Sequence, residues 1–337
     1  MKRNVLFTVA LFATLTASAQ NIAAVSPSNV TTMYQTLDKA ITDAEDGSII
    51  YLPGGGFQIK DETKITKSLT IMGVSHRADA DNADGATVIA GNLNFEKGSS
   101  GSSVTGVFIS GNINVGTDVD SVNNLTIRYC NVNSIQVRHS QSSGMAVNQC
   151  YLRNGSNFGY CNVQLENNIV HSVGHITGGI IDHNIIAYST TGYNVGATGR
   201  YGQYYQSFAL GGVHNSRITN NILLDCGDCH NGDNCIISNN SRGTVSWGEE
   251  SVVMEEGKTW DDVFGANKGI SVNSKYHLTS SWGKKAGSDG TDIGIYGGSG
   301  FKDDKSLAPI PRIVSKKVDE HTDGSGNLHI EITVKAD

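Results

Sequence analysis

The stretch IIDHNII, residues 180–186, decides the fold because its pattern recurs along much of the chain. The pattern is an apolar residue, two variable residues and an Asn, which is usually followed by another apolar residue. We mark the position of the Asn in each copy, which Val or Cys occupies in three of them. The marked residues are Val74, Asn92, Asn112, Cys130, Cys150, Asn168, Asn184, Asn221 and Asn240. Neighbouring copies are 16 to 20 residues apart, except for one gap of 37 that equals two periods or one period with a long insertion. A period of about 19 residues indicates an internal structural repeat.

Within each copy, apolar residues alternate with polar ones. The residue three positions before the marked one is apolar, as in Ile127, Val147, Leu165 and Ile181, and such alternation is typical of a strand with one buried face. Six copies have Gly, Asn or His directly before the marked residue, and these types accept the positive φ of a tight turn. The marked Asn then points inward and can exchange hydrogen bonds with the amide one coil away. A period of this length accommodates three short strands and their turns. We therefore predict a parallel β-helix of about nine to ten coils with a buried Asn ladder, in which neighbouring coils are roughly 4.8 Å apart.

The segments outside the repeat predict a cap at each end. Near the start, Tyr34, Leu37, Ile41 and Ala44 have helical spacing, which predicts an amphipathic helix over the open first coil. Beyond Asn240 the repeat fades into an irregular stretch that we expect to cap the far end. The large aromatic residues of this stretch are Trp247, Trp260, Phe264 and Trp282. The tail RIVSKKVDEHTDGSGNLHIEITVKAD, residues 312–337, has two alternating segments around DGSGN and predicts a β-hairpin.

The first twenty residues, MKRNVLFTVALFATLTASAQ, predict export. Lys2 and Arg3 precede an apolar core, and Ala17-Ser18-Ala19 is a small-residue cleavage site, as in a secretory signal peptide. The expected divisions are a signal peptide at 1–19, the β-helix with its caps at 20–300 and a β tail at 301–337. No later apolar run is long enough to cross a bilayer, so we expect a secreted, periplasmic or cell-surface protein.

Charge narrows the range of partners. The net charge is −7, and the sequence has no basic stripe, so nucleic acid is a poor partner. An acidic protein also repels acidic polysaccharide unless a cation or local Arg and Lys residues intervene.

Two segments resemble those of a known group of proteins. YQTLDKAITDAEDGSIIYLPGGGF, residues 34–57, resembles the opening of many right-handed β-helix proteins of the pectin-lyase-like superfamily. SDGTDIGIYGG, residues 288–298, resembles the DIGAYGG ending of secreted β-helix proteins of the Bacteroidetes type. Together with the coils, the resemblance covers about residues 30–300 and implies an all-β, single-stranded right-handed parallel β-helix in a carbohydrate-related setting. It implies no particular reaction, because this fold hosts lyases, hydrolases, epimerases and non-catalytic adhesins.

Two carboxylates are the first candidates for catalysis. In the predicted register, Glu166 and Asp182 lie in one outward column with Arg128 and Asn148, about 4.8 Å from coil to coil. Two carboxylates this close would raise the pKa of one of them, as in an acid–base pair of a glycosidase. The alternative is an ordinary solvated row of polar residues.

Histidines and an arginine between the coils are further candidates. His171 and His175 lie near the strand that forms the usual substrate groove of the fold, where a His can act as a general acid or base. Arg138, next to His139, occupies a comparable place two coils earlier and could bind a uronate carboxylate or act as a lyase base. The alternative for each is a turn or surface residue.

The long gap in the repeat contains the densest aromatic cluster of the chain. Glycine-rich flanks predict a projecting loop, in which exposed tyrosines could stack on sugar faces or instead pack back onto the rod. The candidate sugar-binding residues of this loop are Tyr193, Arg200, Tyr201, Tyr204 and Tyr205.

The cysteines and aspartates of the sequence allow, but do not require, a disulfide or a metal site. Cys226 and Cys229 could bond to each other, bind a metal or stay free, and Cys235 falls on an inward strand position. Cys130 and Cys150 fall on the ladder, where they are small buried residues or a disulfide. No cofactor is indicated, although calcium could bind a set of aspartates. These aspartates are Asp225, Asp228 and Asp233.

The sequence therefore supports two hypotheses about function. The first is a secreted protein that binds or processes a polysaccharide or cell-surface glycan, lyase-like or hydrolase-like if it is catalytic. The second is a non-catalytic surface, structural or adhesin-like scaffold. The sequence does not specify the oligomeric state.

Overall fold

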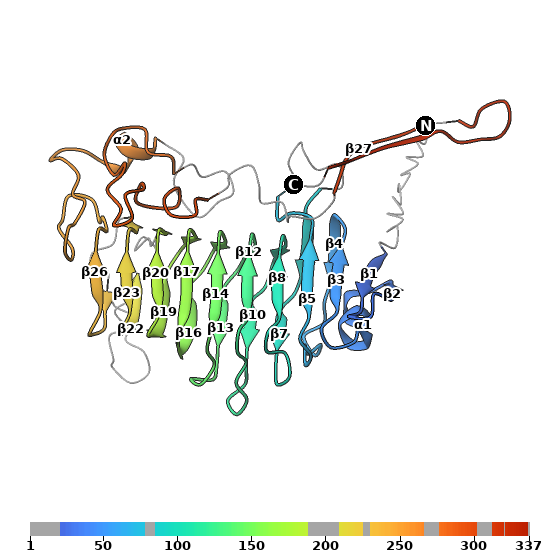
Figure 1. The fold of residues 1–337 in the computed structure, drawn as a ribbon, viewed down its shortest axis with the longest axis horizontal. Helices are drawn as coiled ribbons and strands as arrows, with labels where there is room; N and C mark the ends of the chain where they lie inside the picture. Colours follow the sequence, from blue (N-terminus) through green and yellow to red (C-terminus); the bar gives the residue numbers. More distant parts are fainter. Residues whose placement is uncertain are drawn as a thin grey trace, which may run out of the picture.

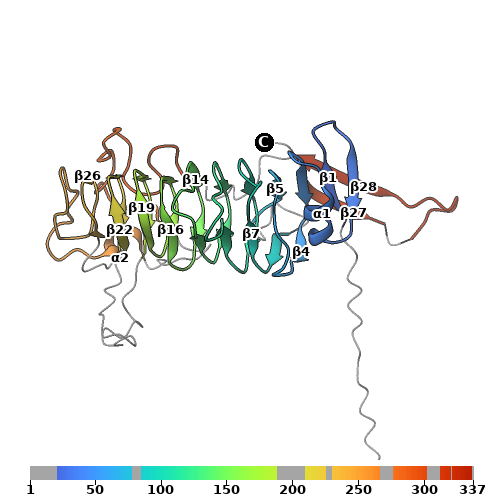
Figure 2. The same ribbon diagram turned by 90° about the horizontal axis from the view of Figure 1, so that it is seen from below.

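The computed structural model describes residues 21–77, 85–187, 209–224, 230–265, 276–301, 312–319 and 321–335. In these residues the chain forms an all-β, right-handed parallel β-helix, whose coils stack into a rod (Figures 1 and 2). Three sheets, here called A, B and C, run along the rod. Sheet A has eleven strands. Its first two pair antiparallel, so the other nine mark nine coils, as the sequence predicted.

The strands of the three sheets are short. Sheet A contains β2 (Thr31–Tyr34), β1 (Ile22–Val25), β3 (Ile49–Leu52), β5 (Thr70–Gly73), β8 (Ser103–Thr105), β11 (Thr126–Arg128), β14 (Met145–Asn148), β17 (Val163–Glu166), β20 (Ile180–Asp182), β23 (Arg217–Thr219) and β26 (Ile236–Ser238). Sheet B contains β4 (Gly55–Gln58), β6 (Thr87–Ala90), β9 (Phe108–Ile109), β12 (Asn131–Val132), β15 (Tyr151–Leu152), β18 (Ile169–Val170), β21 (Ile185–Ile186) and β24 (Ile222–Leu223). Sheet C contains β7 (Leu93–Phe95), β10 (Ile113–Val115), β13 (Ile135–Val137), β16 (Ser156–Cys161), β19 (Val173–Thr177), β22 (Leu210–His214) and β25 (His230–Asn231).

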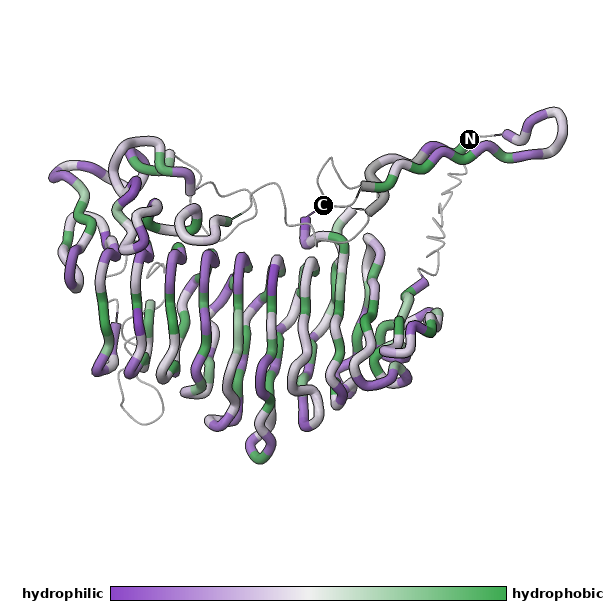
Figure 3. The backbone as a smooth tube through the Cα atoms, in the orientation of Figure 1, coloured by the Kyte–Doolittle hydropathy of each residue, from purple (hydrophilic) through white to green (hydrophobic). Residues whose placement is uncertain are grey.

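One apolar core fills the rod from end to end. The inward residues Ile127, Val147, Leu165, Ile181 and Ile218 of sheet A are aligned from coil to coil and are buried. Sheets B and C contribute equivalent inward positions to the same cluster. Figure 3 shows the resulting alternation of hydrophobic and hydrophilic residues along the strands. Burial of one side chain in two is therefore the main stabilising feature of each coil.

An amide ladder lies at the corner that follows sheet A. Oδ1 of Asn184 accepts hydrogen bonds from the backbone nitrogen and Nδ2 of Asn168, at 2.9 and 3.0 Å. Asn221 receives the same pair of bonds from Asn184, and Asn240 receives it from Asn221. The direct contact between Asn184 and Asn221 resolves the gap of 37 residues, which is one period with an insertion. The predicted ladder is confirmed for these four residues.

Two cysteines continue the ladder toward the N-terminus. Cys130 and Cys150 are free and buried, and their thiols donate to the carbonyl oxygens of Arg128 and Asn148, at 3.0 and 3.2 Å. Burial raises the pKa of the Cys150 thiol. Of the two alternatives, small buried residues and not a disulfide occupy these positions.

Asn92 and Asn112 do not belong to this ladder, so their predicted register was wrong. Ile89 and Ile109 pair with each other in sheet B, which places both asparagines at the corner between sheets B and C. Val107 takes the ladder position of that coil, because Ser103 of β8 pairs with Thr126 of β11. The error has a physical cause: this second corner also uses a small residue and an Asn.

The N-terminal cap is a helix preceded by a strand pair. The helix α1 (Leu37–Asp43) packs three buried residues against the core, and its N-cap Thr36 accepts a bond from the backbone nitrogen of Lys39 at 3.3 Å. The predicted capping helix is confirmed, but Tyr34 was wrongly included, since it ends β2.

The aromatic residues after the repeat mostly cover the side of the rod. Trp247 packs against the end of the core, as predicted. Trp260 and Phe264, in α2 (Trp260–Phe264), instead join a second apolar cluster with Tyr151, Ile169, Ile185 and Ile222 of sheet B. The partly buried Trp282 packs against the same cluster. The outward side chains of sheet B are apolar at these four positions for this reason. We call this covering, residues 252–265 and 276–301, the C-terminal layer.

The tail forms the predicted hairpin. β27 (Arg312–Val318) and β28 (Ile330–Lys335) pair antiparallel with one register shift.

The ladder yields a prediction about stability. Asn184→Ala removes the acceptor for Asn168 and leaves buried polar groups unpaired, so it should lower the free energy of unfolding by about 2–4 kcal/mol. Asn184→Cys should lower the free energy of unfolding by less, since Cys130 and Cys150 occupy the same ladder position in other coils. Chemical denaturation measures both, with Gln164→Ala on the exposed face of β17 as the control. Equal effects of Asn184→Ala and Gln164→Ala would show that the ladder contributes little.

A buried histidine yields a prediction about pH. His76 contacts the ring of Tyr151, its Nδ1 bonds the carbonyl oxygen of Tyr129 at 2.9 Å, and its Nε2 has no partner among the described residues. Burial lowers its pKa from 6.5 to about 4. The unfolded chain therefore takes up this proton first, and stability is lost as the pH falls from 6.5 toward 4, by roughly 3 kcal/mol.

Unfolding measured between pH 7 and 4 tests this prediction. His76→Phe keeps a ring in the same place but cannot be protonated, so its stability should fall less steeply over that range. Parallel curves for the two proteins would contradict the assignment.

Candidate functional site

The outer face of sheet C presents a row of amide side chains. Asn94, Asn114, Gln136 and Asn157 occupy equivalent outward positions on four neighbouring strands. Asn114 Nδ2 donates to Asn94 Oδ1 at 2.8 Å, and Gln136 Nε2 donates to Ser134 Oγ at 3.0 Å. Among the described residues, Asn114 Oδ1, Gln136 Oε1 and Asn157 Nδ2 have no partner. These three atoms can therefore bond a ligand that lies along the row.

A groove of about 720 Å³ follows this row across four coils. Its length along the rod is roughly 14 Å, from three coil spacings. The lining is mostly polar and comes from β10, β13, β16, β19, the corner before β10 and the turns that follow β10 and β13. The lining residues are Asn112, Asn114, Asp118, Gln136, Val137, Arg138, His139, Ser140, Asn157, Gly159, Tyr160 and His175. We call this the sheet C groove.

An aromatic cluster marks one end of the groove. Tyr160 is 48 % exposed, and its ring meets that of His175 edge-on, with 4.9 Å between centroids. The ring of His214, one coil further, lies 6.1 Å from that of Tyr160. Tyr160 and His175 both have positive φ, 65° and 56°, which turns them out of the regular strand pattern. His214 Nδ1 also bonds Oδ1 of Asp233 at 2.6 Å.

The groove brings two predicted site residues together. Arg138 and His175 both line it, together with His139, whose Nδ1 accepts a bond from the backbone nitrogen of Gln141 at 3.2 Å. Arg138 is exposed and has no ion-pair partner among the described residues. His171 is not among the lining residues. It lies before β19, bonds Ser172 Oγ at 3.1 Å, and has a pKa lowered by burial.

Glu166 and Asp182 lie on sheet A, outside the groove. They are neighbours in the expected outward column with Asn148, but each carboxylate is bonded to other groups. Glu166 accepts from Gln164 Nε2 at 2.6 Å and Asn148 Nδ2 at 3.4 Å. The carboxylate of Glu166 is therefore held by neighbouring side chains of sheet A.

Asp182 serves as a hydrogen-bond acceptor within the fold. Its Oδ1 accepts from Thr219 Oγ1 at 2.7 Å and Asn220 Nδ2 at 2.9 Å, and its Oδ2 lies 3.3 Å from Nδ1 of His183. Partial burial alone would raise the pKa of Asp182, but bonds from His183, Thr219 and Asn220 outweigh it and hold that pKa below its ordinary value. A general acid needs the opposite shift.

The positive-φ residues before the ladder hold the C-terminal layer on the rod. Asn167 Nδ2 donates to the carbonyl oxygens of Ile295 and Gly297, at 2.9 and 2.8 Å. Asn220 exchanges two bonds with Ser288, one from its Nδ2 to Ser288 Oγ and one from the Ser288 backbone nitrogen to its Oδ1. His183 bonds Thr291 Oγ1 at 3.2 Å. These contacts fix the segment SDGTDIGIYGG along the corner.

Close contact with His183 explains why two glycines, Gly297 and Gly298, end that segment. A Cβ at Gly297 would overlap the buried ring of His183, and Gly298 packs on the same ring with φ 58°. His183 in IIDHNII is thus a contact of the C-terminal layer.

Several predicted site residues lie outside the described residues. These are Tyr193, Arg200, Tyr201, Tyr204 and Tyr205, together with Asp225, Cys226, Asp228 and Cys229. Among the residues that the structure describes, no three His, Cys, Asp or Glu side chains come together as a metal site. In the same residues, no helix is long and apolar enough to span a membrane.

Sequence reasoning missed the amide row and Tyr160. A signal was present, because the triplets LNF, INV and IQV repeat an apolar–amide–apolar pattern in successive coils. Tyr160 had no comparable signal, since its outward position depends on the irregular register between β16 and β19.

The column on sheet A yields a prediction that separates structural from catalytic roles. Asp182→Ala should lower the melting temperature, because it removes the acceptor shared by Thr219 and Asn220 beside the C-terminal layer. Glu166→Ala, the matched change one coil earlier, should alter it little. Thermal unfolding of both variants checks this, and a larger loss for Glu166→Ala would contradict it.

Comparisons with protein-family models, with curated proteins and with solved structures found no match. The assignment of a parallel β-helix therefore rests on the strand pairing of this chain itself.

Proposed function

We propose that this protein is an exported carbohydrate-binding β-helix that holds a polysaccharide or cell-surface glycan along the sheet C groove. The observation that carries the proposal is the groove itself: an elongated, polar depression whose free amide atoms are followed by an exposed tyrosine. Hydroxyl groups of a glycan can both donate to and accept from amides, and an aromatic ring offers an apolar face to a sugar ring. The resemblance to the pectin-lyase-like superfamily and the predicted signal peptide support the same setting.

Binding is better supported than cleavage. The two carboxylates expected to act as acid and base, Glu166 and Asp182, lie on another sheet and are bonded to neighbouring side chains. Of the predicted catalytic residues, His175 lines the groove, in contact with Tyr160; Arg138 also lines it. A lyase-like or hydrolase-like activity would therefore have to use these groove residues.

A pair of matched glutamine variants tests the proposal. Gln136 faces outward on sheet C, whereas Gln164 faces outward on sheet A. For a glycan selected from a panel, Tyr160→Ala and Gln136→Ala should each weaken binding about tenfold, which corresponds to roughly 1.4 kcal/mol. Gln164→Ala should leave the affinity unchanged, and calorimetry on the full chain measures all three.

The same samples are assayed for unsaturated products and new reducing ends. Absence of both with Tyr160-dependent binding is the expected result. Turnover that survives Tyr160→Ala and His175→Ala would contradict the groove assignment. Failure of every glycan to bind would contradict the proposal and leave the non-catalytic scaffold as the better explanation.

A further inference from the structure

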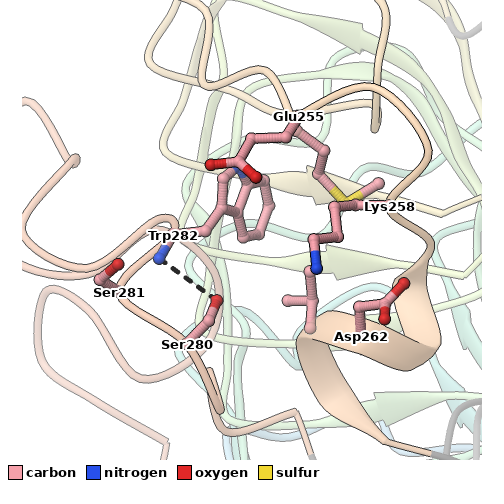
Figure 4. A pocket seen from close by; sticks show the side chains of 8 residues that line it. Glu255, Lys258, Asp262, Ser280, Ser281 and Trp282 are labelled. Atoms are coloured by element: carbon pink, nitrogen blue, oxygen red, sulfur yellow. Dashed lines mark hydrogen bonds between the residues drawn. The ribbon is translucent and has the colours of Figure 1, made fainter.

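A second cavity lies in the C-terminal layer, away from the sheet C groove. It has a volume of about 240 Å³ and forms between α2 with its preceding turn and the segment that contains Trp282 (Figure 4). Its lining residues are Met254, Glu255, Lys258, Asp262, Val263, Ser280, Ser281 and Trp282, none of which lines the groove. The buried Met254 and Val263 form an apolar floor that belongs to the cluster over sheet B.

The Trp282 side chain is held in place. Its indole Nε1 donates to the carbonyl oxygen of Val253 at 3.2 Å, and its ring meets that of Trp260 edge-on with 5.9 Å between centroids. Its backbone nitrogen bonds Ser280 Oγ at 3.3 Å. The ring is thus a preformed apolar wall, which reduces the entropy lost when a ligand binds against it.

The rim of the cavity supplies charged groups of both signs. Figure 4 shows the ammonium of Lys258 directed into the space between Trp282 and Asp262. Glu255 also lines the cavity. Asp262 is oriented by Thr259, whose backbone nitrogen and Oγ1 donate to its Oδ2 at 2.7 and 2.9 Å. Lys258 and Glu255 form no ion pair among the described residues, so both remain available to a ligand.

The charges and size of the cavity define the class of ligand. Two carboxylates against one ammonium disfavour an anion, while the inward ammonium of Lys258 disfavours a cation. An aromatic wall with hydroxyl, carboxylate and ammonium groups around it suits an uncharged ring that has an apolar face and several hydroxyl groups. Because the volume is below the range of about 300–1,000 Å³ for drug-sized ligands, the cavity fits a single ring.

We propose that this cavity binds one neutral sugar unit and is a carbohydrate site independent of the sheet C groove. Its occupant would be a free monosaccharide or a terminal unit of a glycan, and the experiment uses the free form. This proposal does not require that the groove bind a glycan.

Saturation-transfer NMR on the full chain tests the proposal with methyl glycosides of common neutral hexoses, N-acetylhexosamines and deoxyhexoses as probes. At least one should bind saturably with a Kd on the order of 1 mM. Lys258→Met and Glu255→Gln should each raise this Kd roughly fivefold or more, with no change in melting temperature. Trp282→Phe should weaken binding while retaining a ring on the apolar floor.

Two controls make the result decisive. Tyr160→Ala, in the groove, should leave the Kd of the small sugar unchanged. The amine and carboxylate analogues of the bound sugar, a hexosamine and a hexuronate, should bind more weakly than the neutral form. The proposal is overturned if no neutral sugar binds, if either charged analogue binds more tightly, or if Lys258→Met and Glu255→Gln leave the Kd unchanged.

Discussion

The amide ladder at the corner after sheet A is the interaction on which the rest of the structure depends. The backbone bonds of a parallel sheet are alike in every register, so side chains must fix how neighbouring coils align. The ladder does so in its coils, since Asn184 must meet Asn168 on one side and Asn221 on the other. Each amide is buried, so a slip would leave polar groups unpaired in the core. In the coils from Asn168 to Asn240, the ladder thus adds to the register that the buried strand positions set.

Two outer surfaces then acquire different roles. The residues directly before the ladder have positive φ and face outward, where Asn167, His183 and Asn220 bind the C-terminal layer. That layer covers the apolar outside of sheet B. The outside of sheet C has no such cover among the described residues and presents amides, Tyr160 and His175. The C-terminal layer, bound at the corner after sheet A, thus covers sheet B and leaves the polar groove on sheet C exposed.

Much of the fold could be predicted from the sequence, because one buried residue type recurs at one spacing. The ladder from Asn168 to Asn240, the N-terminal helix and the tail hairpin follow from local patterns. The register at Asn92 and Asn112 could not be predicted, because two corners of the coil use the same small-residue–Asn pair. The candidate site was harder still, since a groove depends on how the third strand of each coil is placed relative to the ladder, and that spacing varies between coils. In the motif IIDHNII the Asp and His are polar neighbours with structural partners: His183 contacts the C-terminal layer, and Asp182 accepts bonds from Thr219 and Asn220.

We propose that the sheet C groove, and not the carboxylate column of sheet A, binds carbohydrate. The most direct measurement is a crystal structure of the full chain with a bound oligosaccharide. We expect sugar density along Asn114, Gln136 and Asn157 with one ring against Tyr160. Density centred on Glu166 and Asp182, with the groove empty, would contradict it.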